Sequence, residues 1–169
     1  MNINVPLTNG HLGDAYTKHA NPDQKIGSVP FISFPIEISA VPDNTKSLSL
    51  VMLDWDSIPV CGFAYIHWVA ANIDPKTTKI PENASHNDSV PLVHGNNSTA
   101  GPLAGPLDKT ISQRYLGPTP PNCDHEYTLT MYALDEQLAL KDGFWLNELR
   151  TAMKGHIIAQ ASVELPVLK

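Results

Sequence analysis

Proline is the residue that most constrains how this chain can fold. Fifteen prolines are spread from Pro6 to Pro166, and with ten glycines they interrupt nearly every apolar run of the sequence. Because the proline ring fixes φ and removes a backbone donor, this distribution favours short strands and structured loops over long helices. The chain is therefore predicted to be mainly β.

Four segments have the pattern of strands. Residues 31–40 and 46–54 are rich in apolar side chains and are separated by a Pro-Asp-Asn turn, and residues 64–73 form a third apolar run. From His125 the side chains alternate, which places five residues on one side of a strand: His125, Tyr127, Leu129, Met131 and Ala133. His125 is thus expected to lie in line with core residues.

One helix and one further strand are predicted near the end of the chain. Leu146, Leu149 and Met153 recur at helical spacing, with a cap at Asp142 and a stop at Gly155. Residues 156–165 form the last strand. The region 77–121 is irregular and long for a simple connection, so we expect it to line a site or an interface.

Length and composition fit one compact domain that spans residues 1–169. Hydrophobic residues make up 42% of the 169 positions, which is enough for a real core. Charged residues are only 17% and the formal net charge is −6, so no positive field exists to gather nucleic acid or anionic lipid. Any anion that the protein binds has to be held locally.

The chain shows no apolar run near the roughly 20 residues that span a bilayer. Its first residues lack the basic start, apolar run and cleavage site of a secretory signal, so we expect a cytoplasmic protein. Cys61 and Cys123 fit that compartment as reduced thiols, and their spacing matches neither a zinc site nor a redox pair. No cofactor is predicted.

Acidic and imidazole side chains meet at the predicted strand ends. Asp54 ends one strand, Asp56 follows in the turn, and the next strand brings His67 back beside them. Far along the chain, the stiff segment 117–121 directly precedes His125. Two histidines and two aspartates are therefore predicted to converge on one spot.

Such a cluster admits three kinds of chemistry. The histidines can hold an anion while an aspartate fixes the tautomer of each ring. The same side chains can ligate zinc, although the closely spaced pairs of known zinc motifs are missing. His67 with an aspartate can also act as a general base for Cys61, Cys123 or a serine. Equally, His67 can be a satisfied buried polar group, and Asp54 and Asp56 can simply tie down a turn.

Five stretches of the sequence together carry a resemblance to a known family. They are VPDNTKSLSLVMLDWDSIP, IHWVAANI, HGNNS, YLGPTPPNCDHEYTLTMYALD and LNELRTAMKGHIIAQASV, and they occur in the family's order. The chain resembles the phosphatidylethanolamine-binding protein family, specifically its bacterial branch of Raf-kinase-inhibitor-like proteins. The resemblance spans most of the chain.

The resemblance implies an antiparallel β-sandwich with one or two peripheral helices and a small anion pocket at one end. By position, six residues look like the pocket residues of the family: Asp54, Asp56, His67, Pro121, His125 and Tyr127. The aspartates would then orient histidines that receive a phosphate or a carboxylate. Preorganised groups of this kind lower the ordering cost of binding.

The sequence departs from the family pattern around the expected pocket. Trp55 and Ile58 stand where the family usually has prolines, and Pro59 comes one place late, so the turn is expected to differ in shape. Glu126 follows His125 where many members have arginine, which predicts weaker or narrower anion selection. Cys61 and Cys123 fall in the two segments that flank the expected pocket, so a regulatory disulfide between them is an open hypothesis.

Three functions from different classes remain open at this point. The first is a binding protein for a small anion of the phosphate, phosphoethanolamine or carboxylate type, with a regulatory role. The second is an inhibitor of a kinase or protease that binds a protein partner through the exposed region 77–114. The third is a hydrolase that uses the His/Asp cluster. A homodimer is expected from the bacterial relatives.

Overall fold

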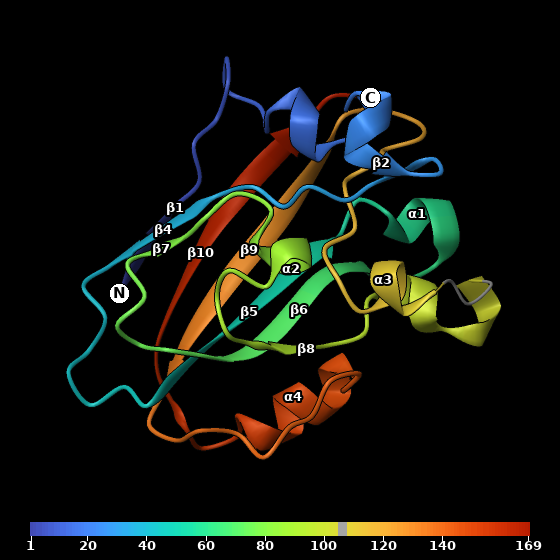
Figure 1. The fold of residues 1–169 in the computed structure, drawn as a ribbon. Coiled ribbons are helices and arrows are strands. Elements are labelled where there is room, and N and C mark those ends of the chain that lie inside the picture. The colour runs from blue at the N-terminus through green and yellow to red at the C-terminus, as the bar shows by residue number, and fades with distance from the viewer. Residues whose placement is uncertain (105–107) are drawn as a thin grey trace.

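The structure is a computed structural model, and it describes residues 1–104 and 108–169. Two antiparallel sheets enclose the main core, with the longer strands of one sheet crossing behind the short strands of the other (Figure 1). The five-stranded sheet has the order β10 (Ile157–Val167), β9 (His125–Leu134), β5 (Ser47–Asp54), β6 (Tyr65–Ile73), β8 (Val93–His94). The three-stranded sheet has the order β1 (Asn2–Asn4), β4 (Ile36–Ser39), β7 (Lys79–Ile80).

Helices and a small hairpin complete the fold. The hairpin pairs β2 (Lys25–Ile26) with β3 (Val29–Pro30). The α-helices are α1 (Ile58–Cys61), α2 (Ala84–Asn87), α3 (Lys109–Ser112) and α4 (Leu146–Ala152). The 3₁₀ turns of the described residues are η1 (Asp14–Tyr16), η2 (Pro22–Gln24), η3 (Ser98–Ala100) and η4 (Pro102–Ala104). Within the described ranges, no helix is long and apolar enough to cross a membrane.

The predicted mainly β architecture is confirmed, and β5, β6, β9 and β10 follow the predicted segments closely. The prediction of a strand over residues 31–40 is wrong in extent, because only Ile36–Ser39 pairs as β4. Pro35 offers no backbone donor directly before this strand, and Ala40 ends it with a φ of 51°. The term sandwich describes the architecture loosely, since the smaller sheet has three short strands.

The helix near residue 146 is confirmed, but its predicted cap is wrong. The N-cap is Trp145, whose backbone N–H donates to Glu148 Oε2 at 2.6 Å. Asp142 instead accepts a hydrogen bond from the backbone N–H of His94 at 2.8 Å. The helix ends at Ala152, three residues before the predicted stop at Gly155, and Gly155, with a φ of 87°, lies within the turn 153–156 that follows.

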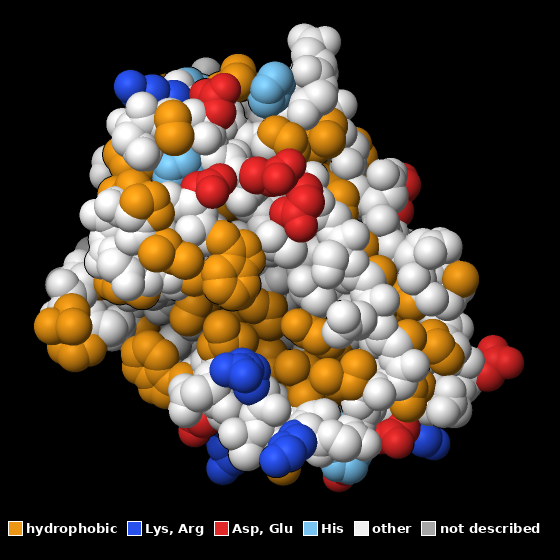
Figure 2. Space-filling view, turned by 180° about the vertical axis from the view of Figure 1, so that it is seen from behind, with side chains coloured by type: hydrophobic (Ala, Val, Ile, Leu, Met, Phe, Trp, Pro, Cys, Tyr) orange, Lys and Arg blue, Asp and Glu red, His pale blue; other side chains and the backbone are white. Residues whose placement is uncertain are grey.

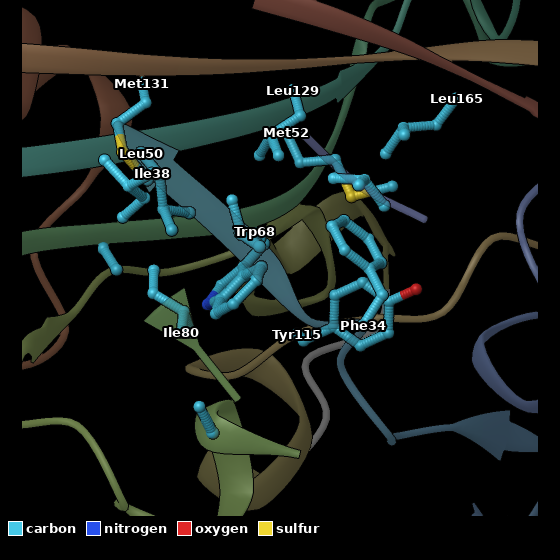
Figure 3. Close-up of a cluster of buried hydrophobic side chains, with 14 of the residues drawn as sticks. Phe34, Ile38, Leu50, Met52, Trp68, Ile80, Tyr115, Leu129, Met131 and Leu165 are labelled. Carbon is cyan, nitrogen blue, oxygen red and sulfur yellow. The ribbon is translucent and has the colours of Figure 1, made fainter. Parts of the chain in front are cut away.

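The main core lies between the two sheets and reaches the end where β5 stops. Leu50 and Met52 of β5 face Leu129 and Met131 of β9 within this cluster (Figure 3). Phe34, Trp68 and Tyr115 meet edge to face, with the Phe34 and Tyr115 rings 5.5 Å apart. Each such aromatic pair contributes about 0.5–1.5 kcal/mol beyond what the burial of its area contributes. These contacts of Tyr115 therefore stabilise the position of the segment around it beside β6.

A second apolar cluster lies on the opposite face of the five-stranded sheet. Val51, Val69 and Leu134 pack there against Leu149 and Met153 at α4. Seen from behind, hydrophobic side chains form a broad area with acidic side chains above it and Lys and Arg side chains below (Figure 2). Strand β5 contributes side chains to both apolar clusters. It is therefore buried on both faces, and this burial fixes its register.

Candidate functional site

A cavity of about 300 Å³ lies where β5 ends and β6 and β9 begin. The antiparallel register pairs Asp54 with Tyr65 on one side and with Tyr127 on the other. His67 and His125 lie two residues from these tyrosines, on the same faces of their strands. The cavity is lined by Val29, Asp54, Ser57, Val60, Cys61, Tyr65, His67, Thr99, Leu116, Thr119, Pro121, His125 and Tyr127.

Asp54 and His125 form a buried pair at the floor of this cavity. His125 Nδ1 donates to Asp54 Oδ2 at 2.9 Å, and their exposed fractions are 2% and 4%. The other carboxylate oxygen, Oδ1, accepts the backbone N–H of Ser57 at 3.1 Å. Both oxygens of Asp54 are thus hydrogen-bonded, which compensates the burial of the carboxylate.

The second nitrogen of His125 has a partner on the loop before β9. His125 Nε2 lies 2.8 Å from Asn122 Oδ1, and Asn122 is exposed. Asp54 therefore orients the ring through Nδ1 and leaves Nε2 toward a surface side chain. A ligand that uses Nε2 has to displace or share the Asn122 amide.

His67 is held by two hydrogen bonds to one residue. His67 Nδ1 donates to the carbonyl oxygen of Leu116 at 2.8 Å, and the Leu116 N–H donates to His67 O at 2.9 Å. Burial lowers the pKa of His67 to about 4, although the Leu116 carbonyl and Asp54 partly oppose this and His125 adds to it. At neutral pH the His67 ring is uncharged, and its Nε2 is an acceptor.

Tyr127 separates the two histidines. Its ring lies 4.9 Å from the His67 ring, nearly perpendicular to it, and 6.2 Å from the His125 ring. Burial and the negative charge of Asp54 raise the pKa of Tyr127 far above its usual value. The phenol therefore stays protonated. Tyr65 borders His67 on the other side and stacks on Phe63.

The proline-rich segment 117–121 forms one wall, and the N-terminal part of the chain supports it from behind. Gly117 N–H donates to Pro30 O at 2.9 Å. Lys18 donates to this wall twice, from its backbone N–H to Pro118 O at 2.9 Å and from Nζ to Pro120 O at 2.8 Å. Pro121 itself lines the cavity. The wall is stiff because of its proline rings and because of these long-range bonds.

Five of the six residues predicted for the pocket border one cavity, and Asp56 does not. Its Oδ2 accepts the backbone N–H of Glu126 at 2.9 Å, so its carboxylate ties the turn after β5 to the start of β9. Asp56 fits the turn-stabilising alternative. The side chain of Glu126 is exposed.

Among the residues that the structure describes, no lysine or arginine lines the cavity. In the part of the chain that the structure describes, no group of three His, Cys, Asp or Glu side chains is placed to hold a metal ion. Cys61 and Cys123 are both exposed free thiols. Cys61 Sγ lies 3.3 Å from the carbonyl oxygens of Ser57 and Phe63.

Several residues of the site were not predicted from the sequence, among them Ser57, Leu116, Asn122 and Thr99. Ser57 is buried, and its Oγ donates to Asp54 O at 2.7 Å and accepts the Tyr65 N–H at 2.9 Å. A serine three residues after a strand-ending aspartate is a typical turn signal and would have indicated it. Leu116, Asn122 and Thr99 reach the site from irregular segments, where no periodic pattern marks them.

Comparison with known proteins tests the resemblance that the motifs indicated. The sequence model of the phosphatidylethanolamine-binding protein family matches residues 4–167. The chain belongs to this family. The protein YxkA of Bacillus subtilis is 49% identical over 165 residues, covering 98% of each chain. A UPF0098 protein of Chlamydia trachomatis is 35% identical over 134 residues, covering 78% of this chain and 79% of its own.

Solved structures of the phosphatidylethanolamine-binding protein family have the same fold. A homologue of this family from Chlamydia trachomatis, CT736, superposes with a TM-score of 0.79 at 26% identity, over 99% of this chain and 97% of its own. YbcL of Escherichia coli, described as a member of the mammalian family, gives a TM-score of 0.76 at 18% identity over 99% and 98% of the two chains. The family and fold predictions are confirmed.

Proposed function

We propose that this protein binds a small anionic ligand, bearing a phosphate or carboxylate group, in the cavity between His67 and His125. The observation that supports it is the pair of buried histidines, each fixed through Nδ1, that border one cavity of about 300 Å³. This volume is at the lower end of the roughly 300–1,000 Å³ that small-molecule sites occupy. Because the wall and both rings are already ordered, binding costs little conformational entropy.

Calorimetric titration with phosphate, phosphoethanolamine and acetate tests this function. The informative variant is His67→Asn, because an Asn side-chain N–H can still donate to Leu116 O while the Nε2 position is lost. We expect binding of at least one of the three anions to wild type and a weaker affinity in the variant. His156→Asn is the matched control, since His156 lies beyond the opposite end of β9 and contacts Asp135. Equal affinities in wild type and His67→Asn would contradict the proposal.

A second candidate function is binding of a protein partner, as an inhibitor of a kinase or protease. The supporting observation is a run of exposed apolar side chains beside the cavity, in addition to the region 77–114 that the sequence indicated. Trp55, Ile58, Val60 and Phe63 are 45–52% exposed. Trp55→Ser with Phe63→Ser should abolish capture of a partner that Asp54→Ala retains, and the reverse pattern would exclude this surface.

A further inference from the structure

Strand β10 forms an open edge of the five-stranded sheet. It pairs with β9 alone and is the red strand labelled β10 in Figure 1. Pro166 O accepts the backbone N–H of Leu12 at 2.8 Å, so the backbone of Pro166 points away from β9. Because these directions alternate along a strand, the N–H and C=O groups of Gln160, Ser162 and Glu164 also point away from β9.

The edge is accessible around its middle. Strand β1 approaches β10, but it hydrogen-bonds to β4 and packs Ile3 against the main core. Within the described ranges, the edge-facing backbone groups of residues 160, 162 and 164 have no backbone partner. Leu165 and Val167 are buried at the end that Leu12 covers, whereas Ala161 and Val163 are half-buried. Solvent therefore reaches the edge between residues 160 and 164.

This edge lacks the features that keep natural edge strands apart. Native sheets protect their edges with lysine, proline, bulges or a covering segment. Residues 157–165 contain no lysine or proline, and Glu164 is their one ionisable side chain. The register shift in the pairing with β9 lies between Ile157 and Ala159, before the open stretch. Residues 160–164 can therefore accept another strand in regular register.

We propose that β10 pairs antiparallel with β10 of a second copy of this chain, about a two-fold axis at Ser162. In this register Ser162 lies opposite Ser162 of the second copy, and Gln160 lies opposite Glu164. Each of these three residues then exchanges both of its backbone hydrogen bonds with the second copy. An axis at residue 161 or 163 would instead place one of them opposite residue 158, at the register shift, or opposite Pro166, which has no N–H.

The side chains of this register are complementary. Opposite residues share a face, so the Gln160 amide can donate to Glu164 Oε1 of the second copy, while Glu164 Oε2 accepts from Thr128 Oγ1 at 2.8 Å. On the core face Ala161 lies opposite Val163, which pairs a small side chain with a larger one. No like charges meet. A two-fold interface needs this kind of self-complementarity, so a second copy of the chain fits the edge.

Analytical ultracentrifugation of the full chain over a dilution series tests the interface. We expect a wild-type dimer that dissociates on dilution, because association costs translational and rotational freedom. Ser162→Pro removes an edge N–H at the axis and leaves the bonds from the residues on either side to β9 in place. It should weaken the dimer by about tenfold or more, since each copy loses one backbone hydrogen bond. Ser162→Ala keeps the N–H and is the matched control.

Thiol cross-linking with a short bismaleimide tests the register independently of Ser162→Pro. The background is Cys61→Ser with Cys123→Ser, because both native thiols are exposed. Ser162→Cys places two thiols at the axis, with Cα atoms about 5.5 Å apart. Thr130→Cys is the control, since Thr130 pairs with Ser162 from β9 and its two copies would lie three strand spacings, about 14 Å, apart. We expect a covalent dimer from Ser162→Cys and little from Thr130→Cys.

Three results would overturn the proposal. The first is a wild type that stays monomeric at every concentration. The second is a dimer that Ser162→Pro leaves unchanged while circular dichroism shows the native fold. The third is equal cross-linking of Ser162→Cys and Thr130→Cys, because the two copies then meet through another surface. If Ser162→Pro does not fold, the cross-linking pair decides alone.

Discussion

Asp54 is the residue through which the site is held together. Its carboxylate accepts from His125 and from the Ser57 N–H, and its carbonyl accepts from the Ser57 hydroxyl. We expect Asp54→Ala to lower the free energy of unfolding by about 2–5 kcal/mol, because it leaves buried donors without acceptors. Urea denaturation measures this change.

Asp56→Ala is the matched control for that substitution. Asp56 is exposed and accepts one backbone hydrogen bond, so its loss should cost no more than about 1 kcal/mol. Similar losses in the two variants would show that the buried pair with His125 adds nothing to stability.

Residue-level prediction from the sequence succeeded where strand periodicity applied. The alternation from His125 to Ala133 correctly placed His125 with the core, and the two strand ends brought Asp54 and His67 together. Asp56 and Asn122 lie in turns, where neither the strand period nor the helix period determines which way a side chain points. Asp142 was misassigned for a related reason, since its partner, the His94 N–H, is 48 residues away.

At the scale of elements, the wall 117–121 depends on close contact with the N-terminal segment. A Cβ on Gly117 would lie 2.5 Å from Pro30 Cβ and 2.9 Å from Tyr16 O, and neither neighbour is the end of a flexible side chain. We expect Gly117→Ala to cost about 1–3 kcal/mol of stability and to weaken phosphate binding by displacing the wall. Thermal unfolding and titration measure the two effects.

Gly101→Ala is the control at the same scale. Its φ is −73°, and an added Cβ would meet Ser98 O at 3.4 Å, an ordinary contact. It should change stability by no more than about 0.5 kcal/mol. If Gly117→Ala also leaves the stability unchanged, the wall 117–121 is not packed against Pro30 as the structure shows.

For the whole molecule, two histidines predict how stability depends on pH: His67, which is buried, and His86, which is partly buried. The pKa of His67 and of His86 is about 4 in the folded state, against 6.5 for the unperturbed group, chiefly because of burial and, for His86, also because of Arg114. Between these values the unfolded chain takes up protons that the folded protein does not. Stability is therefore full above about pH 6.5 and falls as pH is lowered toward about 4.

His67→Asn isolates one of the two contributions. Its free energy of unfolding should fall less steeply with acid than that of wild type, by up to about 1.4 kcal/mol per pH unit. Urea denaturation at about pH 7, 6 and 5 provides the comparison. Parallel curves for the two proteins would mean that the pKa of His67 is the same in the folded and unfolded states.

The mainly β architecture was predictable because proline spacing and alternation act along the whole chain. The burial of β5 on both faces was less predictable from the sequence, because a continuous apolar run fits either a buried strand or a buried helix. The homodimer stays a prediction.

The double hydrogen bond between Leu116 and His67 also bears on how a ligand reaches the cavity. These bonds connect the proline-rich wall 117–121, through the neighbouring Leu116, to β6. Lys18 bonds the same wall to the N-terminal part of the chain, so the wall is held in place from both directions. Another side is α1, whose backbone bonds run within residues 55–62 and whose four residues are exposed. Access should then be governed by brief unwinding of α1, and amide protons there should exchange with solvent faster than those of the Leu116 side.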